Sequence, residues 1–279
     1  MMTQITWDVS PEVFDGFAFL RWYGLCWVVG MLLAYKIMLN IYKSEDTSVH
    51  ELDNLTMYLV LGILIGARLG HIIFYDPIHY WNNPIEILPF KINPTFEFTG
   101  LAGLASHGGI LGALFALYLF TRKFKKNYLR LLDRVAIAGA ALGCFIRLGN
   151  LMNSEIIGIP SNLPWAFVFT RIDLVPRHPA QLYEAIFYLG ITVMLYLVWR
   201  SKKFNERYGF ISGLGIASIF TQRFLIEFLK ENQVSFEQNL ILNMGQVLSI
   251  PLVLAGIGLM IWSWKSMPSS QTPVGDGTV

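Results

Sequence analysis

Long apolar runs separated by shorter polar stretches dominate the sequence. A helix that crosses the hydrocarbon core of a bilayer needs about 20 mostly apolar residues. The runs that reach this length lie near Phe19–Leu39, Leu55–Tyr75, Leu101–Thr121, Leu132–Met152, Ala180–Trp199, Gly209–Leu229 and Leu240–Trp264. They are too uniformly apolar for the alternating strands of a membrane barrel. The pattern therefore predicts an all-α polytopic membrane protein with about seven transmembrane helices.

The composition supports this class. Of the 279 residues, 54% are hydrophobic and 14% are charged, whereas soluble domains carry about 25% charged residues. The net charge of +2 argues against the strongly basic surface of a nucleic-acid-binding protein. Asp8, Glu12 and Asp15 precede the first apolar run where a signal peptide would carry basic residues, which predicts that this run is a retained span.

The distribution of Lys and Arg predicts the orientation, because short basic loops stay in the cytoplasm. The basic residues after the third and fifth runs are Arg122, Lys123, Lys125, Lys126, Arg130, Arg200, Lys202, Lys203 and Arg207. The N-terminus is therefore predicted outside (periplasmic) and the C-terminus cytoplasmic. Residues 1–264 are predicted to form a single transmembrane domain with two long outer loops, 76–100 and 153–179, as accessory elements. Residues 265–279 are predicted to be a flexible cytoplasmic tail.

Polar side chains gather near the outer ends of several predicted spans. Ionisable groups within a bilayer are costly and mark functional sites. On the run that begins near Leu101, His107 is expected about 9 Å below the outer end. Arg68, Arg147 and Arg223 lie at similar depth, and a guanidinium fork matches phosphate oxygens. This one-sided layer predicts a polar cavity that opens to the outer leaflet and binds an anion at headgroup depth.

Two features leave alternatives open. Arginines near helix ends can simply extend to the interface, and Arg223 and Glu227 are spaced to neutralise one another. Glycines four residues apart, as in Gly62, Gly66 and Gly70, are typical of closely packed helices. Gly108 and Gly109 beside His107 fit the same packing, or would let a lipid headgroup approach the backbone. The carboxylates that can offset the positive charge are Glu155, Glu184 and Glu227.

Six short segments carry most of these polar residues. They are Arg21–Gly24, Gly103–Gly109, Arg147–Asn150, Arg177–Glu184, Arg223–Glu227 and Met244–Gln246. In this order, on a multispan chain, they resemble the signature blocks of bacterial prolipoprotein diacylglyceryl transferases. Two positions depart from the family pattern: Ser154 stands where the family often has glycine, and Lys230 stands where it usually has arginine. A lysine keeps the charge but loses the bidentate fork.

The resemblance implies an enzyme of the bacterial inner membrane whose active site faces the outer leaflet. It would transfer the diacylglyceryl group of phosphatidylglycerol to the lipobox cysteine thiol of a preprolipoprotein signal peptide. The products would be a thioether and glycerol phosphate, in the first step of lipoprotein maturation. The expected partners are these two substrates and the lipid bilayer, with no nucleic acid, no cofactor and no metal.

The resemblance also implies the site residues. The catalytic ones are His107, Arg147 and Arg223, and the substrate-binding ones are Tyr23, Arg68, Asn150, Glu155, Gly158, Glu227, Gly108 and Gly109. Arg147 and Arg223 would stabilise the charge that develops on the departing phosphate. Two roles stay open for His107, as the base that generates the thiolate or as a hydrogen-bond partner of the headgroup.

Three other function classes are compatible with an apolar chain that holds an anion site. A lipid-binding structural protein is one, but it would not need the His and Asn beside the arginines. An organic-anion transporter would place polar groups near mid-membrane and often shows repeated halves, whereas the polar layer here is one-sided and no repeat is visible. A different phospholipid-headgroup enzyme would use the same arginines, but it would not be expected to carry the six segments in family order.

Overall fold

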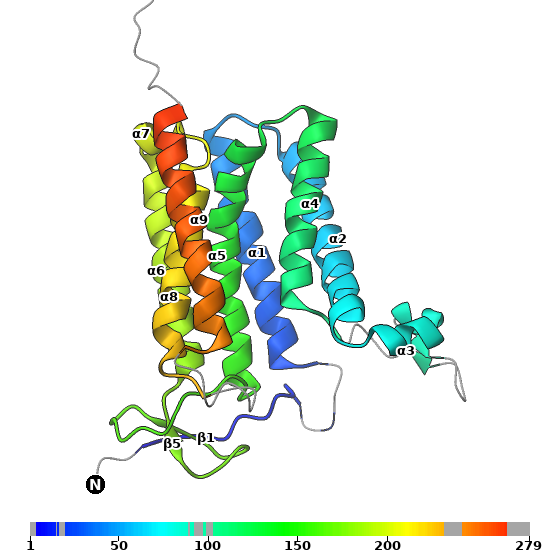
Figure 1. Cartoon of the computed structure of the whole chain (residues 1–279), viewed down its shortest axis with the longest axis vertical. Coiled ribbons are helices and arrows are strands. Elements are labelled where there is room, and N and C mark those ends of the chain that lie inside the picture. The colour runs from blue at the N-terminus through cyan, green and yellow to red at the C-terminus, as the bar shows by residue number, and fades with distance from the viewer. Residues whose placement is uncertain are drawn as a thin grey trace, which may run out of the picture. The chain divides into compact units, whose positions relative to one another are not determined.

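Seven helices of 18 to 26 residues dominate the described part of the chain (Figure 1). The computed structural model describes residues 4–14, 16, 20–88, 90–91, 97–98, 103–231 and 242–266. The long helices are α1 (Trp22–Ser44), α2 (Val49–Phe74), α4 (Ser106–Phe124), α5 (Tyr128–Met152), α6 (Ala180–Arg200), α8 (Phe210–Glu227) and α9 (Met244–Ser266). Each contains most of one predicted apolar run. Residues 267–279, which hold most of the predicted tail, lie outside the described residues.

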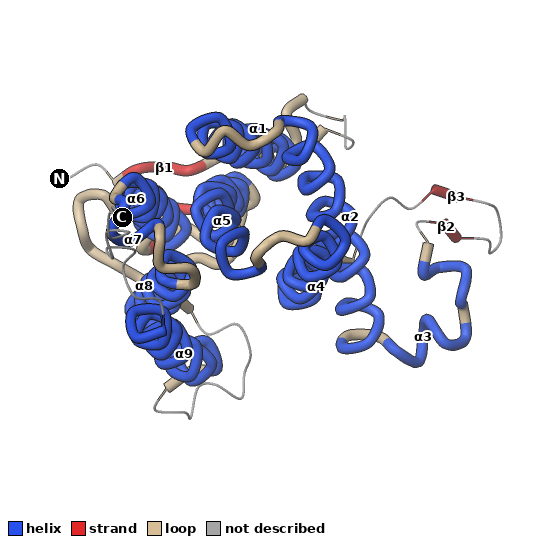
Figure 2. Tube along the Cα trace, turned by 90° about the horizontal axis from the view of Figure 1, so that it is seen from above, coloured by secondary structure: helices blue, strands red, loops and turns tan. Residues whose placement is uncertain are grey.

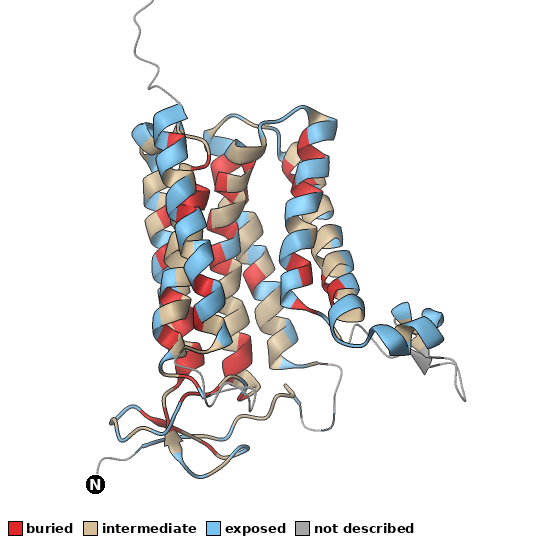
Figure 3. Cartoon of the chain, in the orientation of Figure 1, coloured by how far each residue is buried: buried red, intermediate tan, exposed pale blue. Residues whose placement is uncertain are grey.

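Five of these helices, α1, α2, α5, α6 and α9, are long and apolar enough to cross a membrane. The two others, α4 and α8, carry several ionisable residues within their length. His107, Arg122 and Lys123 lie on α4, and Arg223 and Glu227 lie on α8. The outward faces of the helices are apolar and exposed, as at Leu32, Phe115 and Leu254 (Figure 3). Apolar side chains exposed in this way are typical of surfaces that face lipid.

The chain forms two compact units, residues 1–38 with 132–279 and residues 39–131. In the first unit, α8 packs against α6 and α9, and a small sheet covers one end of these helices (Figures 1 and 2). The strands are β1 (Ile5–Trp7), β4 (Phe167–Phe169) and β5 (Pro176–Arg177), in the order β1-β4-β5. Strand β1 pairs parallel to β4, with Ile5 opposite Phe167, and β5 pairs antiparallel to β4.

The strands show that the all-α prediction is wrong for segments outside the long helices. A core of Leu151, Ile157, Phe167 and Phe169 holds the sheet to the end of α5, with Trp7 packed against it. The Trp7 indole also donates a hydrogen bond to the carbonyl of Leu151, at 3.1 Å. Strands of two or three residues are too short for an alternating pattern to reveal. Strands β4 and β5 lie in the loop between α5 and α6, and β1 lies before α1.

At the opposite end of the first unit, a buried carboxylate fixes the start of α8. Asp133 on α5 accepts hydrogen bonds from the backbone N–H groups of Gly209 and Ser212, at 2.8 and 2.7 Å, and from the Ser212 hydroxyl at 2.6 Å. The first N–H groups of a helix have no partner within it. Asp133 therefore supplies from α5 the cap that α8 lacks locally.

The second unit is built on a close contact between α2 and α4. A methyl group added at Gly66 would lie 2.4 Å from the Gly108 carbonyl oxygen, and one at Gly112 would lie 2.0 Å from the Gly62 carbonyl oxygen. These distances leave no room for any side chain. The packing interpretation of the glycine spacing is therefore confirmed for this pair of helices.

We expect Gly108→Ala to destabilise the protein strongly and Gly109→Ala to be tolerated. An added methyl group at Gly108 would lie 2.2 Å from the Gly66 carbonyl oxygen, whereas at Gly109 its nearest neighbour is Ala67 Cβ at 3.5 Å. Overpacking of this kind costs about 1–3 kcal/mol. Thermal unfolding of the two variants in detergent measures the difference. Equal melting temperatures would contradict the packing described for α2 and α4.

The helix α4 starts at Ser106, later than the apolar run that begins at Leu101 predicts. Gly103 has φ +73°, and the N–H of Ala105 bonds to the Ala67 carbonyl of α2 at 2.9 Å instead of continuing a helix. His107 is thus the second residue of α4, and the expectation that it lies about 9 Å below the start of the helix is wrong. The segment between α2 and α4 contains α3 (Pro77–Asn82), η1 (Pro84–Ile87) and the antiparallel strands β2 (Phe90–Lys91) and β3 (Glu97–Phe98).

Candidate functional site

A chain of buried ion pairs joins α5, α6 and the end of α8 in the first unit. Glu184 on α6, whose side chain is 1% exposed, lies between two cations. Its Oε2 is 3.2 Å from Arg147 Nε, and its Oε1 is 3.0 Å from Lys230 Nζ. Lys230 Nζ also contacts Glu227 Oε2 at 3.0 Å. Buried charges are tolerated when they are paired in this way.

A tight backbone crossing places Lys230 in this chain. Gly158 forms a β-bridge with Lys230, and its N–H donates to the His178 carbonyl at 3.0 Å. A methyl group at Gly158 would lie 2.5 Å from the carbonyl oxygen of His178 and 2.7 Å from that of Leu229. Glycine is needed here because two other backbone segments approach it. Gly158, predicted to bind substrate, is thus a residue that positions Lys230.

Glu155 is fixed beside Arg147. Its two carboxylate oxygens accept hydrogen bonds from Asn150 Nδ2, at 3.1 Å, and Asn153 Nδ2, at 2.9 Å. Its backbone N–H donates to the Asn150 carbonyl at 3.0 Å, and its carbonyl accepts from the side chain of Gln181. Arg147 Nη1 donates to Asn150 Oδ1 at 3.4 Å. The structure therefore brings together three predicted site residues, Arg147, Asn150 and Glu155.

The backbone on both sides of Glu155 is strained. Ser154 has φ 54° and Ile156 has φ 56°, a left-handed region that favours glycine and that β-branched residues rarely enter. Ser154 is also buried, and its hydroxyl has no partner among the described residues. Strained residues of this kind cluster at functional sites, where the surrounding structure holds them. The family's preference for glycine at position 154 has a physical reason in this φ angle.

We expect Ser154→Gly to stabilise the protein by about 1 kcal/mol. Relief of the left-handed strain is worth about 1–2 kcal/mol, and the greater freedom of glycine in the unfolded chain removes part of that gain. Thermal unfolding compares this variant with Ser161→Gly in the same loop, because Ser161 does not have a positive φ. A melting temperature below that of the unsubstituted protein would contradict the strain at Ser154.

Two tyrosines complete this part of the site. Tyr23 of α1 packs on Gly149, where a methyl group would lie 2.8 Å from the ring, and it is an electrostatic neighbour of Glu155 and Arg147. Tyr188 of α6 has Arg147, Glu184 and Arg223 as its electrostatic neighbours. These electrostatic interactions associate Tyr23 and Arg223, both predicted site residues, with the cluster around Arg147.

The cluster is balanced in formal charge. Its cations are Arg147, Arg223 and Lys230, and its carboxylates are Glu155, Glu184 and Glu227. The predicted pairing of Arg223 with Glu227 is wrong, because Glu227 pairs with Lys230 instead. Arg223 has no ion-pair partner among the residues that the structure describes. Within the cluster, Arg223 is thus the cation best placed to meet an incoming anion.

In the second unit, Arg68 is engaged by the protein itself. Its guanidinium donates to the carbonyls of Ile87 at 2.9 Å, Gly103 at 3.4 Å and Glu86, and it lies 5.0 Å from the centre of the Tyr80 ring. These contacts hold the loop that follows α2. The position of Arg68 therefore fits a structural role better than the predicted contact with an anion.

His107 lies in the first turn of α4 and is exposed. Within its own unit, it has no hydrogen-bond or ring partner among the described residues. Of its neighbours, Gly108 is used for helix packing, whereas Gly109 has room around it. Both predicted roles of His107 stay predictions.

An ion pair in the loop between α5 and α6 supports the backbone at Gly158. Arg177 donates to Asp173 Oδ2 at 2.6 Å and to the Gly158 carbonyl at 3.3 Å, and it contacts Glu231 at 3.2 Å. The hydrogen bond from Arg177 lowers the pKa of the Asp173 carboxyl and raises the pKa of Arg177 itself. Both groups therefore stay charged at neutral pH, which keeps this support in place.

Comparison with known proteins identifies the family. The family described as "Prolipoprotein diacylglyceryl transferase" matches residues 11–262, which is nearly the whole chain. The chain belongs to the prolipoprotein diacylglyceryl transferase family. The predicted resemblance is therefore confirmed.

Three similar proteins carry the name phosphatidylglycerol–prolipoprotein diacylglyceryl transferase. The one from Bacteroides fragilis is 47% identical over 269 residues, covering 95% of this chain and 97% of the relative. The one from Tolumonas auensis is 45% identical and covers 93% and 97%. The one from Porphyromonas gingivalis is 41% identical and covers 94% and 95%. With its apolar helices and bacterial relatives, the chain is a bacterial membrane protein.

Three residues of the cluster are absent from the predicted site. Glu184 was expected only to offset charge, Lys230 stood out only as a departure from the family pattern, and Tyr188 carried no signal of its own. The spacing offers a partial signal, because Tyr188 lies one helical turn after Glu184 on α6 and Lys230 lies three residues after Glu227. The bridging of Glu184 by two cations depends on contacts between helices that the sequence does not encode locally.

Proposed function

We propose that the protein transfers the diacylglyceryl group of phosphatidylglycerol to the lipobox cysteine of a preprolipoprotein. The observation that carries this proposal is the family match over residues 11–262. The relatives' shared name states both substrates. The buried cluster around Arg147 supplies a polar site of the kind that the reaction requires.

The reaction needs no covalent enzyme intermediate. The cysteine thiol of the substrate protein loses its proton, and the thiolate attacks the glycerol carbon that bears the phosphate. A carbon–sulfur bond forms as the carbon–oxygen bond breaks, and the electron pair leaves on the oxygen of glycerol phosphate. The thioether and glycerol phosphate are the products. The remaining requirements are a thiolate, since a free thiol has a pKa of about 8.5, and stabilisation of the leaving group.

Arg147 and Arg223 are the residues that we assign to the leaving group. Glu184 and Asn150 orient the guanidinium of Arg147, so its charge is fixed before the reaction begins. Donors held in this way stabilise developing charge more than mobile ones do. Glu155, Glu227 and Tyr23 would hold the surrounding geometry. His107 would act as the base or bind the headgroup, as the family resemblance implies.

The proposed topology has seven spans in the bacterial inner membrane, with residues 1–264 as one catalytic domain. The N-terminus would be periplasmic, the C-terminus cytoplasmic and the site would face the outer leaflet. Within the first unit, the basic residues around α7 (Lys202–Asn205) lie at the end of α6 opposite to Glu184 (Figure 1). This separation is what cytoplasmic basic loops and an outward-facing site require.

Labelling of single cysteines in intact cells tests the topology. With the two free cysteines, Cys26 and Cys144, replaced by alanine, we expect Asn162→Cys to react with a membrane-impermeant maleimide. Lys203→Cys should react only after the cells are opened, although both native side chains are exposed. The opposite labelling pattern would overturn the orientation.

The activity test uses the purified protein in phosphatidylglycerol vesicles with a lipobox peptide. We expect the peptide to gain the mass of one diacylglyceryl group. A peptide whose lipobox cysteine is replaced by serine, and vesicles of phosphatidylethanolamine alone, are the controls and should give no product. An unmodified cysteine peptide in the presence of folded protein would overturn the proposal.

A further inference from the structure

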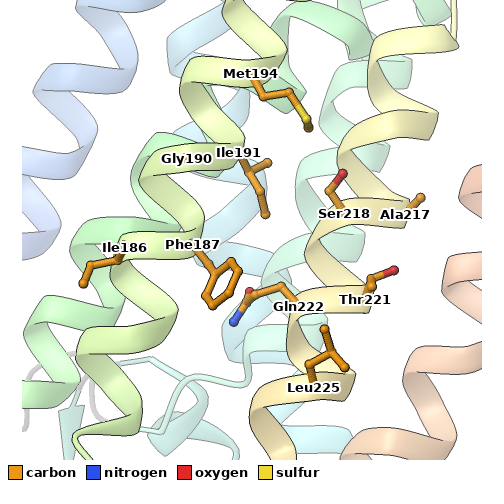
Figure 4. Close-up of a pocket in the computed structure, with 10 residues that line it drawn as sticks. All are labelled: Ile186, Phe187, Gly190, Ile191, Met194, Ala217, Ser218, Thr221, Gln222 and Leu225. Carbon is orange, nitrogen blue, oxygen red and sulfur yellow. The ribbon is translucent and has the colours of Figure 1, made fainter.

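A groove of about 490 Å³ lies between α6 and α8, apart from the ion-pair cluster (Figure 4). Ile186, Phe187, Ile191 and Met194 line it from α6, and Leu225 lines it from α8. Ile186, Phe187 and Leu225 are about half exposed, so the groove opens on the apolar outer face of these helices. In a membrane, this opening gives lipid direct access to the groove.

A buried amide side chain lies in the wall of this mostly apolar groove. Gln222 of α8 is 4% exposed, and its amide extends toward Phe187 of α6 (Figure 4). Neither Nε2 nor Oε1 has a hydrogen-bond partner among the described residues. An unpaired buried amide is unfavourable, and native proteins nearly always satisfy such groups. The observation points to a ligand that brings a hydrogen-bonding group to this depth.

The position of Gln222 along α8 fits the ester groups of a glycerolipid. Gln222 precedes Glu227 by five residues, which places it about 7.5 Å further along the helix axis. The headgroup region on each side of a bilayer is about 5–8 Å thick. With the cluster at Glu227 at the level of the phosphates, Gln222 lies where the headgroup region meets the hydrocarbon. The acyl ester carbonyls occupy this level, and they accept hydrogen bonds.

The size of the groove favours an acyl chain over a protein helix. A methylene group is similar in size to a water molecule, whose share of liquid volume is about 30 Å³. A volume of 490 Å³ therefore holds about 16 such groups, which is the length of one acyl chain. A helix with side chains is about 10 Å or more across and would not fit between two helices that pack against one another.

We propose that this groove binds one acyl chain of the reacting phospholipid, with Gln222 Nε2 donating a hydrogen bond to the ester carbonyl of that chain. The inference rests on the proposed function and names the part of the substrate that the ion-pair cluster does not contact. Gln222 thus distinguishes ester-linked from ether-linked lipids.

The test compares diacyl phosphatidylglycerol with its dialkyl ether analogue as substrates in thioether formation. For the unsubstituted protein, we expect KM to be about 3- to 10-fold lower for the ester lipid, the size of effect that one hydrogen bond gives. In Gln222→Leu, the ratio of the KM for the ether lipid to the KM for the ester lipid should fall to about 1, and this variant should still form thioether. The control Met194→Leu, which conserves volume in the same groove, should keep the ratio.

Several results would overturn the inference while the proposed function stands. One is an equal KM for both lipids in the unsubstituted protein, which decides the matter even if the variant fails to fold. Another is an ester preference that Gln222→Leu retains. A third is that ester-linked phosphatidylcholine stabilises the protein against heat more than its ether analogue does, while the KM values for the two phosphatidylglycerols are equal. That result would assign the groove to a bulk lipid and not to the substrate. Absence of any thioether product would instead overturn the proposed function, and this inference with it.

Discussion

Replacing Arg147 with glutamine is expected to lower kcat for thioether formation about 100-fold or more. The guanidinium of Arg147 is held by Glu184 at 3.2 Å and by Asn150 at 3.4 Å, so its charge is in place before the leaving group departs. Removal of one such donor from an active site typically costs a factor of about 10²–10³. Initial rates with a lipobox peptide and phosphatidylglycerol, read by mass spectrometry, measure the effect.

The pattern of loss across variants distinguishes catalysis from folding. Arg223→Ala and His107→Asn should also lose thioether formation while inserting normally into the membrane. Arg130→Gln is the matched control, because Arg130 belongs to the other unit and forms an exposed ion pair with Glu45 at 3.1 Å. Unchanged turnover in the Arg147, Arg223 and His107 variants would contradict the site assignment.

Replacing Lys230 with methionine is expected to destabilise the protein by about 3 kcal/mol or more. The Lys230 ammonium, 4% exposed, is 3.0 Å from both Glu184 and Glu227. Its loss leaves two buried carboxylates with one cation fewer, and breaking a buried pair costs about 3–5 kcal/mol. Unfolding of the purified variant by denaturant in detergent measures the change.

Two further variants separate loss of charge from loss of shape. Lys230→Arg, which restores the residue usual in the family, should keep most of the stability. Lys230→Met combined with Glu227→Gln should recover part of the loss, because one unpaired carboxylate is removed along with the cation. A Lys230→Met variant as stable as the unsubstituted protein would contradict the buried network.

The helices could be predicted from the sequence because long apolar runs are a local property of the chain. The ends of the helices could not be predicted where other segments of the chain determine them. The helix α4 begins at Ser106 because Gly103 adopts a positive φ and Ala105 bonds to α2. The helix α2 begins at Val49, six residues before the predicted Leu55, because a polar first turn continues the same helix outside the apolar run.

The sequence predicted those parts of the site that depend on neighbouring residues of one helix, but not the contacts between distant segments. Arg147 and Asn150 lie one helical turn apart on α5, so their contact follows from spacing. The sequence could not show whether Arg68 binds a phosphate or the protein itself, because the carbonyls to which it donates come from residues distant in the chain. Lys230 loses the bidentate fork of arginine, yet its compact ammonium contacts two carboxylates at once.

The central claim is that a thiolate displaces glycerol phosphate from the glycerol carbon of phosphatidylglycerol. Phosphatidylglycerol labelled with ¹⁸O in the oxygen that bridges the diacylglyceryl carbon and the phosphorus tests it most directly. We expect mass spectrometry to find the label in released glycerol phosphate, and the peptide to carry an unlabelled diacylglyceryl group in a thioether. An unmodified peptide, or a peptide adduct that retains the ¹⁸O, would contradict the claim.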